Sequence, residues 1–150
     1  MKKSELKILS DYFGELPMGS IKDSDIRRAV IKFYCQLAAL YKPIAEEMET
    51  MRTSVIGDKQ QDVITYLKLQ QAGDEESIKK ANEMEDCVRI ESDFKVMSHE
   101  ILNQNLPDDT ELPKIPLDVL YEALADCGFP KLSINAGPSA IANQFRPIIE

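Results

Sequence analysis

The sequence predicts an all-α protein: a long, kinked antiparallel helical hairpin with short flanking helices. Two stretches, residues 25–56 and 74–104, carry apolar residues every three or four positions, which is the spacing of one helix face. Both are long enough to lie against each other in opposite directions. A third observation is the segment 106–116, where three prolines in eleven residues predict an irregular connection.

A short helix is expected to open the fold over residues 4–13. Leu6, Leu9 and Phe13 recur at helical spacing and share one face. Ser4 suits the N-cap, because its hydroxyl can accept a hydrogen bond from an amide of the first turn. Gly14 suits the helix end.

The hairpin's first arm, residues 25–56, is the strongest signal in the chain. Asp23 or Ser24 can cap its start. Its apolar positions follow a heptad seam with one stutter close to Pro43, where the missing amide and the ring clash predict a kink. The seam consists of Ile26, Val30, Phe33, Leu37, Leu40, Ile44, Met48, Met51 and Val55.

Residues 58–72 leave two interpretations open. Val63 and Leu67 suit a helix, whereas Val63, Thr65, Leu67 and Leu69 also alternate as a strand would. We expect a helix, since the flanks are rich in glutamine and a lone strand would need a partner.

The hairpin's second arm is expected to run unbroken over residues 74–104. Acids crowd its first turn, as the helix dipole favours. An apolar stripe follows, interrupted by Glu91, and consists of Ile78, Ala81, Met84, Val88, Phe94, Met97 and Ile101. A last short helix is expected from Leu117 to Gly128. Residues 1–129 would form one helical domain and 130–150 a tail that is either docked or mobile.

Composition narrows the function classes. The net charge of −8 repels a phosphate backbone, so we expect no nucleic-acid binding. No apolar run approaches the length of a membrane span, and no signal peptide is recognisable. The three cysteines, Cys35, Cys87 and Cys127, form no C-x-x-C pair, which argues against a disulfide framework. We expect a cytoplasmic protein.

Several classes of catalytic site are excluded because the sequence lacks the residues that they require. His99 is the single histidine, so H-E-x-x-H zinc sites and paired Glu-x-x-His di-iron sites cannot form within one chain. Ser98 is its neighbour along the helix and points elsewhere, and no G-x-S-x-G elbow exists. The scattered glycines make no phosphate loop. We therefore expect no cofactor and no catalytic residue.

One enzyme alternative rests on carboxylates. Glu46-x-x-Glu49 and Glu83-x-x-Asp86 lie on separate predicted helices, and two such pairs facing each other could hold Mg²⁺ for pyrophosphate chemistry. The pattern resembles that of the all-α nucleoside triphosphate pyrophosphohydrolases. With 26 acids in 150 residues, acid pairs at this spacing are expected by chance.

The order of elements is similar to that of small, uncharacterised helical proteins encoded by tailed phages and prophages. The resemblance covers residues 5–129. Its motifs are F-x-x-L-P-x-G (Phe13, Leu16, Pro17, Gly19), Arg27 and Arg28, E-x-D-F-x-x-x-x-x-E-I-L (Glu91, Asp93, Phe94, Glu100, Ile101, Leu102) and a final L-x-x-L-Y-x-x-L helix. It implies a non-enzymatic accessory or assembly role, in the host cytoplasm or the virion.

The expected function is protein–protein interaction, by self-association or by docking of a partner helix on the seam. An equally weighted alternative is that the helices at 4–13 and 117–127 cover the seam and close a monomer. A second function class is an acidic inhibitor or decoy of a nucleic-acid-binding protein. Its motivation is an acid-rich set: Asp74, Glu75, Glu76, Glu83, Glu85, Asp86, Glu91 and Asp93.

Overall fold

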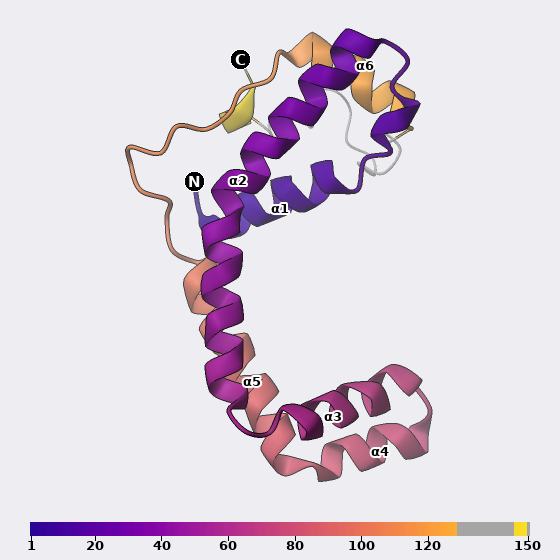
Figure 1. Cartoon of the computed structure of the whole chain (residues 1–150), viewed down its shortest axis with the longest axis vertical. Helices are drawn as coiled ribbons and strands as arrows, with labels where there is room; N and C mark the ends of the chain where they lie inside the picture. The colour runs from indigo at the N-terminus through magenta and orange to yellow at the C-terminus, as the bar shows by residue number, and fades with distance from the viewer. Residues whose placement is uncertain (129–145, 150) are drawn as a thin grey trace. The chain divides into compact units, whose positions relative to one another are not determined.

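The computed structural model describes residues 1–128 and 146–149. The regular elements among these residues are helices, with no named strand, so the predicted all-α class is confirmed (Figure 1). The helices are α1 (Lys3–Gly14), α2 (Ser24–Ile56), α3 (Gln60–Ala72), α4 (Glu75–Glu83), α5 (Glu85–Leu102) and α6 (Leu117–Cys127), with 3₁₀ turns η1 (Met18–Ser20) and η3 (Arg146–Ile148).

Contacts divide the chain into two compact units. Unit 1 comprises Met1–Pro43 and Gln104–Glu150, and unit 2 comprises Ile44–Asn103. Pro43 lies within α2, at the boundary between the units. The kink expected at this proline and the single domain expected over 1–129 both stay predictions.

The start of unit 1 corrects one prediction. α1 buries Leu6, Leu9 and Phe13 as expected, but it begins at Lys3, and its N-cap Lys2 makes no side-chain hydrogen bond. The Lys3 amide donates to the carbonyl of Gln104 at 2.9 Å instead. A backbone acceptor from far along the chain satisfies this amide, so the cap predicted at Ser4 is wrong.

The next cap was predicted correctly. The Asp23 carboxylate accepts hydrogen bonds from the amides of Asp25 and Ile26, at 2.8 and 3.1 Å, and so caps the start of α2. α1 ends at Gly14, where a side chain would crowd α2, because a Cβ there would lie 3.1 Å from the Tyr34 hydroxyl oxygen.

The predicted seam lies largely inside the protein. Val30, Phe33, Leu37 and Ile44 are buried. The remaining seam residues are half-buried: Ile26, Leu40, Met48, Met51 and Val55. In unit 1 the Phe13 ring meets the Phe33 ring edge to face, with centroids 5.0 Å apart. α1 therefore covers this part of the seam, as the closed alternative requires.

The other end of unit 1 is closed by α6 and by residues near the C-terminus. α6 ends at Gly128, whose φ of 71° lies in the left-handed region that glycine tolerates best. Ile148 is fully buried, and its carbonyl accepts a hydrogen bond from the Ile115 amide at 2.8 Å. Residues 146–149 are therefore docked, and the rest of the predicted tail lies outside the described residues.

In unit 2, residues 60–72 form a helix, so the helical interpretation of this segment was right. α3 and α4 lie side by side and run in opposite directions (Figure 1). The turn between them uses Gly73, with φ 74°, and the carboxylate of Asp74, which accepts from the Ser77 amide at 3.0 Å. The core of unit 2 consists of Val63, Tyr66, Ala81, Cys87 and Ile90.

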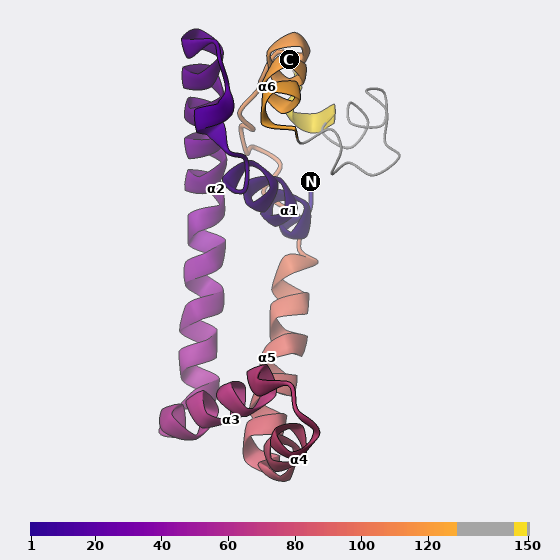
Figure 2. The ribbon, with the colours of Figure 1, turned by 90° about the vertical axis from the view of Figure 1, so that its right-hand side faces the viewer.

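The unbroken helix predicted over 74–104 is wrong. Met84 leaves the helical region, with φ −82° and ψ 71°, and separates α4 from α5, which then run in different directions (Figure 2). Met84 packs against the unit 2 core. The break allows α4 to bury Ala81 beside α3 while α5 buries Cys87 and Ile90, so tertiary packing outweighs local helix propensity.

Candidate functional site

Helix α5 presents three faces with different chemistry. The core face carries Cys87, Ile90, Phe94, Met97 and Ile101, buried or half-buried, at alternating spacings of three and four. A second face repeats with the same period beside it: Val88, Glu91, Ser92, Lys95, Ser98, His99 and Leu102. A third face, with Arg89, Asp93 and Glu100, is exposed. Successive helical residues turn by about 100°, so these faces are distinct.

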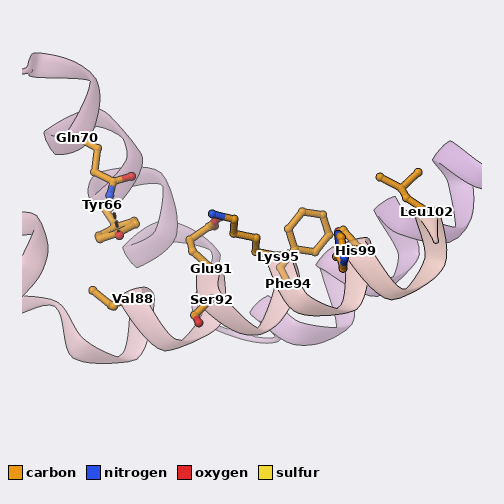
Figure 3. Close-up of a pocket in the computed structure, with 10 residues that line it drawn as sticks. Tyr66, Gln70, Val88, Glu91, Ser92, Phe94, Lys95, His99 and Leu102 are labelled. Atoms are coloured by element: carbon orange, nitrogen blue, oxygen red, sulfur yellow. Dashed lines mark hydrogen bonds between the residues drawn. The ribbon is translucent and has the colours of Figure 1, made fainter. Parts of the chain in front are cut away.

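The second face forms the floor of a hollow of about 810 Å³, hereafter the α5 groove. Val88 lies at one end and Leu102 at the other (Figure 3). Tyr66 and Gln70 of α3 line the Val88 end, and the Gln70 amide donates to the Tyr66 hydroxyl at 2.7 Å. From Val88 to Leu102 the floor is about 21 Å long at 1.5 Å per residue. Its length matches four turns of an incoming helix.

Arg52 of α2 contacts two residues at the middle of the α5 groove. The Arg52 guanidinium forms two hydrogen bonds with the Glu91 carboxylate, at 2.8 and 3.3 Å. Its Cζ also lies 5.0 Å from the centroid of the Phe94 ring. A two-pronged arginine–carboxylate pair fixes geometry as well as charge. The Glu91 carboxylate is therefore fixed in place on the groove floor.

The groove brings no reactive pair together. His99 is exposed on its floor, and the neighbouring Ser98 hydroxyl oxygen is buried without a hydrogen-bond partner. The two side chains thus make no serine–histidine dyad. Cys87 is buried on the core face. The pKa of its thiol is raised, mainly because burial disfavours the charged thiolate. Its neighbours favour the unreactive thiol form.

The four carboxylates of the magnesium hypothesis do not share a site. Glu83 and Asp86 line one hollow, with Asp62 and Glu85. Glu49 lines a different one, beside Arg52. Across residues 1–128 and 146–149, no three His, Cys, Asp or Glu side chains are placed to hold a metal ion. Glu46, which is exposed on α2, belongs to neither hollow.

Bases already neutralise part of the acid-rich set. Asp86 lies 3.1 Å from the Lys59 ammonium and 3.4 Å from the Arg89 guanidinium. The pKa of the Asp86 carboxyl is lowered, mainly because Lys59 donates a hydrogen bond to it. Glu91 is bound by Arg52, and Glu76 lies 3.5 Å from Lys80.

The sequence interpretation missed the α5 groove because it followed apolar residues alone. It placed Val88 in the buried stripe, yet Val88 is 38% exposed. A signal was present: Cys87, Ile90, Phe94, Met97 and Ile101 already make a complete heptad face. Assigning that face to the core would have left Val88 and Leu102 on a separate, mixed stripe.

Comparison of the chain with protein-family models, curated proteins and solved structures returns no match. The resemblance to phage-encoded helical proteins stays a prediction. Among the described helices, none combines the length and apolar character needed to cross a membrane.

Proposed function

We propose that this protein acts by binding another protein chain in the α5 groove, with no catalytic step of its own. The observation that carries the proposal is the second stripe of α5, which lines an open hollow from Val88 to Leu102. Helix-in-groove binding requires this combination of length, period and a fixed floor.

The chemistry of the groove fits a protein ligand. Val88 and Leu102 offer apolar contact, as does Phe94, which belongs to the core face but also lines the groove. Lys95 and His99 offer polar contact at helical spacing. Interfaces that form and dissociate combine apolar and polar groups in this way. The groove is also open along its length, as a macromolecular ligand requires.

The predicted seam of α2 supports this role less well. Phe33 lies against Phe13 of α1, and Val30 and Leu37 are fully buried, so these seam residues are not accessible to a partner. An acidic decoy role also has weaker support, because Lys59 and Arg89 offset Asp86 and Arg52 offsets Glu91. We therefore place the interaction surface on α5.

The test is site-specific photo-crosslinking. A benzoylphenylalanine replaces Lys95, at the centre of the groove floor, or Asp93, an exposed residue of the third face and the matched control. Both proteins are irradiated alone and in lysate of the cells that produce the chain, and adducts are identified by mass spectrometry. We expect defined protein adducts at position 95 and few at position 93. Equal labelling at both positions, or none at position 95, would overturn the proposal.

A further inference from the structure

We infer that the occupant of the α5 groove is a second copy of this chain, lying antiparallel with a two-fold axis near Lys95. The inference rests on the proposed function, since it names the partner for the same groove. It follows from the order of side chains along the stripe, which is complementary to its own reverse.

The stripe is matched on either side of Lys95. Val88 and Leu102, both apolar, lie seven positions from it in opposite directions. Glu91 and His99, an acid and a base, lie four positions from it. An antiparallel copy therefore places Val88 of one copy against Leu102 of the other. It also places Glu91 of one copy against His99 of the other, with Lys95 one turn away. A two-fold interface requires this kind of self-complementary patch.

A parallel copy would bring like groups together. Glu91 would face Glu91, and like charges in one interface cost free energy. Lys95 faces Lys95 in either orientation, and in the antiparallel pair the two meet at the two-fold axis. Figure 3 shows the Lys95 side chain extending along α5 toward Glu91. The same reach allows it to turn to the Glu91 of the other copy.

The charge of the whole chain makes this groove a suitable place for self-contact. Each copy carries a net charge of −8, so two copies repel each other over most of their surfaces. In the groove Arg52 already compensates Glu91, and Lys95 and His99 add basic groups. A carboxylate can accept about four hydrogen bonds. Glu91 therefore retains acceptor capacity for a partner's lysine.

The area predicts a weak dimer. A stable interface buries roughly 800 Å² on each partner. One helix face about 21 Å long offers less than that. We therefore expect a dimer that dissociates on dilution, visible by sedimentation velocity over about a hundredfold range of concentration.

Disulfide trapping tests the orientation. In a background of Cys35→Ser and Cys127→Ser, only the buried Cys87 remains. A disulfide needs Cα atoms within roughly 7 Å, so trapping reports register. Under mild oxidation we expect Lys95→Cys to form a covalent dimer with itself. Val88→Cys and Leu102→Cys should each stay monomeric alone and form a mixed dimer together. Asp93→Cys, on the third face, is the control.

The outcomes separate the two proposals. Self-trapping of Val88→Cys without the mixed dimer would show a parallel pair and overturn the inference. A wild-type chain that sediments as a monomer at every concentration, with no trapping at position 95, would also overturn it. In that case photo-adducts of Lys95 with a different protein would leave the proposed function standing. Circular dichroism of each variant checks folding, and the wild-type sedimentation needs no substitution.

Discussion

The two units differ in what they bury. The largest fully buried side chains all lie in unit 1 except Val63, and they include Phe13, Leu37 and Ile148. The unit 2 core combines Tyr66 and Ile90, each 5% exposed, with the small side chains of Ala81 and Cys87. The hollow of about 810 Å³ is in unit 2, beside others of about 220 and 390 Å³, whereas two hollows among the described residues of unit 1 measure about 130 and 370 Å³.

The difference teaches that the more fully buried interior and the proposed binding surface are separated along the chain. Unit 1 covers its apolar faces with its own helices, as Phe13 on Phe33 shows. Unit 2 leaves the groove face of α5 open, and the Arg52–Glu91 ion pair fixes the middle of that face. A surface that must accept a partner cannot also be filled by the protein's own core.

The largest expected effect comes from one substitution made in each unit. Phe13→Ala removes a fully buried ring and should lower the free energy of unfolding by about 3–5 kcal/mol. Phe94→Ala removes a half-buried ring at the groove and should cost less than half as much. Urea unfolding measures both. Equal losses would show that the two units are packed alike.

A smaller effect is expected at the ion pair. Arg52→Met leaves the Glu91 carboxylate unpaired and removes the cation from the Phe94 ring. The two side chains are 22% and 24% exposed, so water screens the pair, and we expect a loss of about 1–2 kcal/mol. Arg52→Lys keeps the charge but not the two-pronged geometry, so it should lose less stability than Arg52→Met. If Arg52→Met unfolds like the wild type, the groove floor does not depend on this pair.

The smallest effect is a pH dependence of unit 2. Hydrogen bonds from the Ser77 side chain, and then from its amide, lower the pKa of the Asp74 carboxyl from 3.8. A carboxyl whose folded pKa is depressed contributes stability above its unfolded pKa, and this is lost as pH falls through the folded pKa. Asp74→Asn keeps a capping side chain but cannot titrate. Between pH 7 and about pH 3, the wild type should therefore lose more stability than Asp74→Asn. If urea unfolding gives the same loss of stability for both proteins, the Asp74 carboxyl does not contribute to the pH dependence.

Much of the fold could be predicted because local rules and packing agree. The α1 face of Leu6, Leu9 and Phe13, the Asp23 cap and the end of α6 at Gly128 all follow from spacing and cap chemistry. The break at Met84 could not be predicted. No glycine or proline marks it, and the apolar period continues through it. The break accompanies the packing of α4 beside α3 and of Met84 against the unit 2 core, which are contacts between distant residues.

The candidate site was less predictable than the fold. A groove floor that mixes Val88 with Glu91, Lys95 and His99 has no apolar periodicity to detect. The acid pairs gave a clear pattern in the sequence, but Glu49 and Glu83 line different hollows. A motif of two residues fixes a spacing on one helix and says nothing about which helices meet.

The hydrogen bonds that join the first residues to the Gln104–Leu106 segment affect the order of events during translation. The Lys3 side chain bonds to Gln104, 101 positions away, and the Leu106 amide donates to the carbonyl of Met1. Unit 1 therefore cannot complete its fold until both of its segments, Met1–Pro43 and Gln104–Glu150, have left the ribosome. Unit 2 draws every contact from one continuous stretch, so its loops cost less entropy to close. On a nascent chain unit 2, which carries the groove, should therefore fold first. At that stage the Gln104 carbonyl, which accepts the hydrogen bond from the Lys3 amide of α1, has not yet emerged.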